Sequence, residues 1–244
     1  MNTELTKFHN EFMFEIKKSI MRGQYKKTVQ RSFLHHSATL MELILTHKDE
    51  DLLKFLFNLK SQNPKYCLEN HEFNTGFLSG LIAKWLDLSV TDTLDCVVAG
   101  LLHDIGETNI SSEILLNPKK PTNKEWEIIK QHPKIGLDIL NKSPWISQNV
   151  LKAVLCHHER LDGTGYPQGL LGSEIPLHAR IVAVAGSFDA MTTNRIYEPG
   201  VDIFFALTDL RNRSFGQLDA KVTRLLHKKM YLHFIDKFEL PVVI

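Results

Sequence analysis

Two short stretches of the sequence combine residue types that bind metal ions. His103 and Asp104 are adjacent at the end of an apolar run that closes at Gly106. His157 and His158 are adjacent at the end of a second apolar run, and a glycine-rich turn follows them. Imidazole offers a neutral nitrogen to a divalent ion, and a carboxylate offers a charged oxygen that can bridge two ions. The two pairs therefore predict a metal centre.

Two further histidines extend this candidate metal centre. His71 lies near the start of a predicted helix, and His132 lies at the end of another, directly before Pro133. A single helical histidine is more often a hydrogen-bonded core or surface residue than a ligand, so neither is informative alone. The joint pattern is harder to dismiss, because all of these side chains fall at helix starts or ends. The candidate metal ligands are His71, His103, Asp104, His132, His157 and His158.

The spacing of apolar residues predicts the helices that would carry these side chains. Thr122 and Glu125 form a capping-box pattern that opens one helix, and Pro133 is expected to end or kink it. We expect no regular element inside the loop 160–176, which holds four glycines and two prolines. No convincing alternating strand pattern occurs before the last few residues. Helices are predicted over 69–86, 91–103, 122–133, 147–159, 177–193, 200–211 and 217–237. The expected fold is an all-α helical bundle in which ligands project from several helices into one interior site.

Residues 1–62 are predicted to form a separate N-terminal helical module. Phe8, Phe12 and Ile16 recur at four-residue spacing, which is typical of an amphipathic helix. A polar stretch with a proline, 61–65, marks the boundary to a second domain over 63–244. The module carries no chemical motif, so its expected role is contact with a partner protein or formation of a homodimer through terminal helices.

Composition excludes several classes of function. Lys plus Arg number 29 against 28 for Asp plus Glu, which gives no electrostatic case for binding a nucleic-acid polymer or a membrane surface. No apolar run approaches the roughly 20 residues of a membrane span. The N-terminus lacks the pattern of a signal peptide, so a cytoplasmic chain is expected. The three cysteines are widely spaced and form no CxxC pair, which argues against a disulfide framework or a zinc ribbon.

The second domain contains a series of short motifs in a fixed order. They are His103-Asp104-Ile-Gly106, Gln131-His132-Pro133, His157-His158-Glu159, Asp162-Gly-Thr-Gly-Tyr-Pro167, Phe188-Asp189-Ala190, and Arg195 with Tyr197. These motifs resemble those of the HD superfamily of metal-dependent phosphohydrolases, and the later ones narrow the resemblance to the HD-GYP subfamily. The resemblance covers roughly residues 64–237. Members of the subfamily are typically cyclic di-GMP phosphodiesterases with two or three iron or manganese ions.

This resemblance implies a role for each candidate residue. His71 and His103 would hold a first metal ion, and Asp104 would bridge it to a second. His132, His157 and His158 would complete the second position. Catalysis would depend on His103 and Asp104, with a water between the two ions attacking phosphorus. The residues implied to contact cyclic di-GMP or a related nucleotide are Tyr166, Gly165, Asp189, Arg195 and Glu107.

The sequence departs from the subfamily pattern at three positions. Glu107 replaces a lysine that faces substrate phosphate, and at about 5 Å and an effective dielectric near 20 each such charge pair is worth about 3 kcal/mol. Gly186 replaces the aspartate that would complete the shell of the first ion. Cys67 replaces a carboxylate that some members use for a third ion. We therefore expect one or two divalent ions, iron or manganese, and weakened catalysis.

Three functions stay open at this point. The chain could be an active HD-GYP phosphodiesterase, a catalytically degenerate member that binds cyclic dinucleotide or a partner protein as a regulator, or an HD phosphohydrolase acting on another nucleotide. Metal content separates the first two, because hydrolysis by the implied route needs two ions. A panel of nucleotides separates the first from the third.

Overall fold

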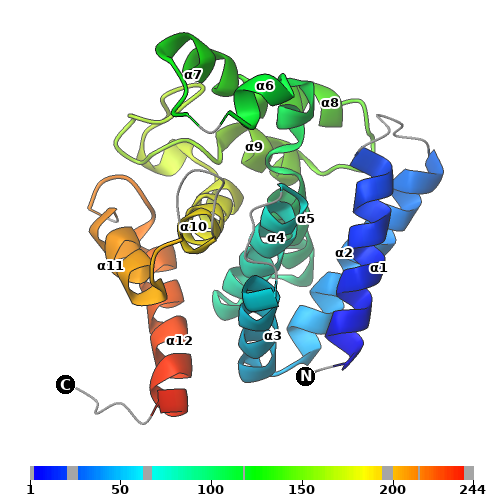
Figure 1. Cartoon of the computed structure of the whole chain (residues 1–244), viewed down its shortest axis with the longest axis vertical. Helices are drawn as coiled ribbons and strands as arrows, with labels where there is room; N and C mark the ends of the chain where they lie inside the picture. The colour runs from blue at the N-terminus through cyan, green and yellow to red at the C-terminus, as the bar shows by residue number, and fades with distance from the viewer. Residues whose placement is uncertain are drawn as a thin grey trace.

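The computed structural model describes residues 3–20, 27–62, 68–117, 119–193, 200–213 and 215–238. No β-strand occurs in these ranges, so the predicted all-α bundle is confirmed (Figure 1). None of the described helices is long and apolar enough to span a membrane. The α-helices are α1 (Thr3–Ile20), α2 (Lys27–Thr46), α3 (Asp49–Gln62), α4 (Leu68–Trp85), α5 (Val90–Leu102), α6 (Ser112–Leu115), α7 (Asn123–Ile129), α8 (His132–Leu140), α9 (Gln148–Cys156), α10 (Leu177–Thr192), α11 (Ile203–Arg213) and α12 (Ala220–Phe238).

Helices α4 and α5 occupy the centre of the fold and pack closely against each other (Figure 1). Glycines permit this approach, because a Cβ on Gly76 would lie 2.6 Å from Leu101 Cγ, and one on Gly100 would lie 2.7 Å from the Gly76 Cα. Helix α10 packs against both central helices. The close packing brings the start of α4, with His71, to the end of α5, with His103.

The N-terminal helices share a hydrophobic core with the central helices. Phe12 of α1 and Leu56 of α3 are buried in the same cluster as Phe73 and Phe77 of α4. The rings of Phe12 and Phe73 meet with centroids 5.5 Å apart. The division of the chain at residue 62 and a role of the terminal helices in dimerisation stay predictions, and residues 63–67, with Cys67, lie outside the described ranges.

Helices α6 to α9 and the loop after α9 cover one end of the bundle (Figure 1). The expected break at Pro133 is observed, because α7 ends at Ile129 and α8 begins at His132 with the proline in its first turn. One expectation about the loop 160–176 was wrong. A short 3-10 helix, Gly172–Glu174, forms inside it, with the Glu174 carboxylate accepting a hydrogen bond from the Leu171 backbone N–H.

Candidate metal centre and pocket

The six predicted ligands converge at the end of the bundle, although they come from four α-helices. His71 lies on α4, His103 caps α5, His132 opens α8, and His157 caps α9. Asp104 and His158 each follow a capping histidine. Their ligand atoms form two groups that could hold a metal ion, and Asp104 belongs to both groups. One group is Asp104, His132, His157 and His158, and the other is His71, His103 and Asp104.

Backbone carbonyls fix the orientation of three of these rings. Nδ1 of His103 lies 2.8 Å from the Gly100 carbonyl, and Nδ1 of His132 lies 2.8 Å from the Ile129 carbonyl. Nδ1 of His157 lies 2.7 Å from the Val154 carbonyl. A carbonyl oxygen can only accept, so Nδ1 carries the proton in each ring. Nε2 of each neutral ring is therefore left with a free electron pair that points into the centre.

The Asp104 carboxylate lies between the two groups. Its Oδ2 is 3.1 Å from His103 Nε2 and 3.7 Å from His71 Nε2. Its Oδ1 is 3.3 Å from His132 Nε2 and 3.4 Å from His157 Nε2, and this buried oxygen forms no hydrogen bond. The Nε2 atoms of His132 and His157 face each other at 3.2 Å. Electron pairs gathered this closely around a buried carboxylate fit a shared divalent cation, so the residues present suit the metal that the motifs imply.

The pKa values of the centre reflect a balance between burial and the charge of Asp104. Burial lowers the pKa of His157 to about 4, and burial with the neighbouring histidines holds the pKa of His158 well below its usual value. Burial would raise the pKa of Asp104, but the surrounding histidines hold it well below its usual range. Burial disfavours the charged rings of His103 and His132, yet Asp104 outweighs it and raises the pKa of both. The ionised carboxylate and the neutral rings of His157 and His158 suit a metal ion, which would have to displace the protons that Asp104 favours on the other two rings.

The structure gives Asp189 a place that differs from the predicted contact with substrate. This side chain is fully buried on α10, behind His71 as seen from the pocket. Its Oδ2 accepts a hydrogen bond from His71 Nδ1 at 2.7 Å, and its Oδ1 accepts one from Asn74 Nδ2 at 2.9 Å. Asp189 therefore orients a candidate ligand and does not line the pocket.

Gly186 lies beside the group formed by His71, His103 and Asp104. A Cβ at this position would lie 3.8 Å from His103 Nε2 and 3.6 Å from Thr75 Cγ2, which are ordinary contact distances. The backbone thus directs a side chain at residue 186 toward this group and leaves room for it. Among the described residues, the group offers three candidate ligands.

Gly106, unlike Gly186, has no space for a side chain. Comparing alanine substitutions at the two glycines tests the packing around the centre. A Cβ on Gly106 would lie 2.0 Å from the carbonyl oxygen of His132 and 2.7 Å from Gly136 N. We expect Gly106→Ala to lower the free energy of unfolding by about 3 kcal/mol, because backbone of α8 would have to move. Gly186→Ala is the matched control and is expected to stabilise α10 by up to about 1 kcal/mol. Urea unfolding of both variants measures this, and equal stabilities would contradict the described packing.

A pocket of about 600 Å³ opens above the candidate metal centre. Tyr166 lines it and stacks on His158, with ring centroids 4.6 Å apart and an interplanar angle of 19°. Trp126 of α7 meets Tyr166 edge to face at 6.2 Å and is 45% exposed. Glu107, Lys119 and Arg160 also line the pocket. The pocket therefore has a carboxylate and histidines at its base, and aromatic and charged side chains along its sides.

The sequence did not single out Trp126, Lys119 or Arg160 as site residues. Trp126 fits the apolar spacing of its helix, which is the pattern of a core residue, yet its side chain is 45% exposed and lines the pocket. No local signal in the sequence distinguishes a core position from one that lines the pocket.

The loop after His158 owes its shape to Glu159 and Gly165. The buried Glu159 carboxylate accepts hydrogen bonds from the backbone N–H groups of Gln168 at 2.6 Å and Leu170 at 3.1 Å. A Cβ on Gly165 would lie 2.4 Å from Arg160 N, so only glycine fits there. Gly165 does not line the pocket itself but lies beside Tyr166, which does, and its contact with substrate stays a prediction. Arg195 lies outside the described residues, as does Tyr197.

Comparison with known proteins agrees with this geometry. The sequence profile of the HD domain family matches residues 54–222. The chain belongs to the HD domain family. It is 39% identical over 180 residues to a cyclic di-GMP phosphodiesterase of Thermotoga maritima, 72% of this chain and 49% of that protein. It is also 46% identical over 123 residues to the cyclic di-GMP phosphodiesterase response regulator RpfG of Xanthomonas campestris, 50% of this chain and 32% of that protein.

A solved structure shows the same fold. Bd1817, described as an HDG"Y"P protein from Bdellovibrio bacteriovorus, matches this HD domain chain with a TM-score of 0.74 and 18% identity. The match covers 92% of this chain and 70% of that one. The chain spans about half or less of the length of the two curated relatives described above.

Proposed function

We propose that this HD-GYP chain is a metal-dependent phosphodiesterase that hydrolyses a cyclic dinucleotide of the cyclic di-GMP kind. The observation that carries the proposal is Asp104, a buried carboxylate shared between two groups of histidines at the floor of a pocket. The names of the two sequence relatives support the choice of substrate. Because those relatives are longer than this chain, activity, substrate and partners of the whole protein all belong to the proposal.

Two divalent ions, iron or manganese, would be held by the residues of the centre. His132, His157 and His158 would hold one, His71 and His103 the other, and Asp104 would bridge both. When bound, such ions lower the pKa of water and neutralise the charge that develops on phosphoryl oxygens. The protein orients the ligands through the Nδ1 hydrogen bonds described above, which keep each Nε2 directed inward.

The pocket walls would bind and orient the nucleotide. Tyr166 and Trp126 present aromatic faces and edges on which a guanine can stack. Lys119 and Arg160 supply positive charge for phosphate, and Glu107 opposes it because two negative charges repel. Glu107 is expected to weaken substrate binding for this reason.

The proposal is tested by hydrolysis of a nucleotide panel in excess Mn²⁺. The panel contains cyclic di-GMP, a second cyclic dinucleotide and a linear dinucleotide. Opening of cyclic di-GMP to a linear dinucleotide or to GMP, lost when EDTA removes the metal, is the expected result. Turnover of the linear dinucleotide alone would favour an HD phosphohydrolase of different substrate range.

A second candidate is a regulator that binds cyclic dinucleotide without turnover. Gly186 favours it, because the described part of the chain offers three candidate ligands at the first metal position and no fourth, and Glu107 adds repulsion toward phosphate. This candidate would hold one ion and bind nucleotide in the pocket without releasing product, which an equilibrium binding assay beside the hydrolysis assay distinguishes.

Trp126 provides a test of the pocket that does not depend on turnover. Trp126→Ala is expected to weaken cyclic di-GMP binding by about 5-fold to 150-fold, because base stacking on an aromatic side chain is worth about 1–3 kcal/mol. Isothermal titration with the variant measures this. Phe205→Ala, which removes a 60% exposed ring from α11, is the control and should bind as the wild type does. Equal affinities of Trp126→Ala and Phe205→Ala for cyclic di-GMP would show that no guanine stacks on Trp126.

A further inference from the structure

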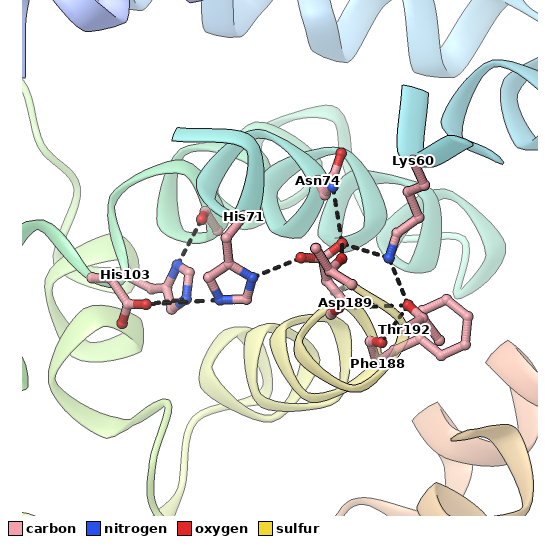
Figure 2. Close-up of polar contacts among 10 residues, drawn as sticks. Lys60, His71, Asn74, His103, Phe188, Asp189 and Thr192 are labelled. Atoms are coloured by element: carbon pink, nitrogen blue, oxygen red, sulfur yellow. Dashed lines mark hydrogen bonds and ion pairs between the residues drawn. The ribbon is translucent and has the colours of Figure 1, made fainter. Parts of the chain in front are cut away.

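Three helices meet at the buried carboxylate of Asp189 (Figure 2). Asp189 lies on α10, and its two oxygens have separate partners. Oδ2 accepts from His71 Nδ1 at 2.7 Å, and Oδ1 accepts from Asn74 Nδ2 at 2.9 Å, both on α4. The third helix is α3, from which Lys60 extends its Nζ to within 2.7 Å of Oδ1. The side chains of Asp189 and Lys60 are 0% and 10% exposed, so water does not screen this ion pair.

The ammonium group of Lys60 is held in one place by several contacts. Nζ donates to Thr192 Oγ1 at 2.6 Å and lies 5.7 Å from the centre of the Phe188 ring. Thr192 Oγ1 in turn donates to the Phe188 carbonyl at 2.7 Å. A buried carboxylate is costly unless a cation and hydrogen-bond donors compensate it, and Lys60 is the cation that does so here.

Lys60 fixes the Asp189 carboxylate, and the carboxylate fixes His71. With Oδ1 held by Lys60 and Asn74, Oδ2 faces the Nδ1–H of His71. His71 Nε2 is thereby directed toward Asp104 Oδ2, 3.7 Å away, and toward the ring of His103, whose centroid is 5.1 Å from that of His71. Figure 2 shows His71 lying between Asp189 and His103.

We propose that Lys60 is a positioning residue for the first metal position, acting on His71 through Asp189. The proposal rests on the metal centre of the proposed function. With Gly186 in place of a carboxylate, His71 is one of three candidate ligands at that position among the described residues, so the metal affinity there depends strongly on the orientation of this ring. A displacement of α3 would move Lys60 and lower the occupancy of the first position without altering the second. The N-terminal helices are thus coupled, through α3, to the first metal position, which has fewer candidate protein ligands than the second.

Mn²⁺ titration of the full chain tests this, with binding followed by calorimetry. Lys60→Met is expected to weaken the weaker class of Mn²⁺ sites by about 10-fold to 100-fold, the usual effect of losing a partner of a metal-bound histidine. The tighter class should change by less than about twofold, because its ligands do not contact Asp189. Lys60→Arg retains the charge and should recover most of the affinity. Lys54→Met, on the same helix in an exposed pair with Glu50, is the matched control and should bind as the wild type does.

The outcomes separate the inference from the proposed function. A wild-type chain that binds no Mn²⁺ would overturn the proposed metal centre itself. If the wild type binds a single ion, the comparison is made in the Gly186→Asp background, which supplies a further ligand. Wild-type affinities in a folded Lys60→Met variant would overturn the inference, and so would an equal loss at both classes, which indicates general loosening. Should Lys60→Met not fold, Lys60→Gln, which keeps a donor without charge, takes its place under the same criteria.

Discussion

Asp104→Asn is expected to remove both metal positions and to lower phosphodiester hydrolysis by roughly 10³-fold, since divalent ions contribute several kcal/mol of charge stabilisation and each 1.4 kcal/mol is tenfold in rate. The substitution keeps the volume of the side chain and removes its charge. Both groups of ligands lose their shared anion, because Oδ1 faces His132 and His157 while Oδ2 faces His103. Elemental analysis and a cyclic di-GMP hydrolysis assay on the same preparation measure the two effects.

Asp138→Asn is the matched control for this variant. Asp138 is exposed on α8, the helix that carries His132, so the variant removes one charge from the same part of the fold without touching the centre. Its metal content and turnover should equal those of the wild type. An Asp104→Asn protein that retained its ions and its turnover would show that Asp104 is not the bridging ligand.

Gly186→Asp is expected to act in the opposite direction and to strengthen the first metal position. The added carboxylate would lie near His103 Nε2 and would pair with a metal ion held there. A pair of opposite charges at about 5 Å is worth about 3 kcal/mol, which is about 10²-fold in metal affinity. The Cβ fits at ordinary contact distances. Thr75 Oγ1, a buried hydroxyl without a hydrogen-bond partner, would lie 3.9 Å from that Cβ and can donate to the new side chain. Turnover at limiting Mn²⁺ should rise accordingly.

Gly186→Ala separates the charge of the new ligand from the effect of filling space. It should leave the Mn²⁺ affinity unchanged, and adding Glu107→Lys to Gly186→Asp should further strengthen nucleotide binding by removing repulsion in the pocket. Two tightly bound ions in the wild type, with no gain on Gly186→Asp, would mean that another group already completes the first position.

The sequence predicted the helical fold and the convergence of the six ligands, because both depend on local signals. Adjacent pairs such as His103 with Asp104 mark helix ends, and Pro133 predicted a break near the place where α8 begins. The role of Asp189 could not be predicted in this way. Its partner Lys60 lies on a helix that carried no motif, and only the tertiary fold brings this long side chain from α3 to Asp189 on α10.

The side chains that line the pocket could not be predicted from local sequence patterns either. Trp126 follows the apolar spacing of a core residue, yet α7 is short and has no buried residue. Whether such a side chain faces a core or a pocket depends on the loop after His158, whose path is fixed by Glu159 through backbone hydrogen bonds ten or so residues away.

We propose that this chain hydrolyses a cyclic dinucleotide with two metal ions, the first of them weakly held. Metal stoichiometry and cyclic di-GMP turnover can be measured on one sample, purified without chelator and then titrated with Mn²⁺. We expect one tightly bound ion at the outset and turnover that rises as a second ion binds. Absence of turnover with two ions bound, or failure to bind a second ion at saturating Mn²⁺, would overturn the proposal and favour a nucleotide-binding regulator.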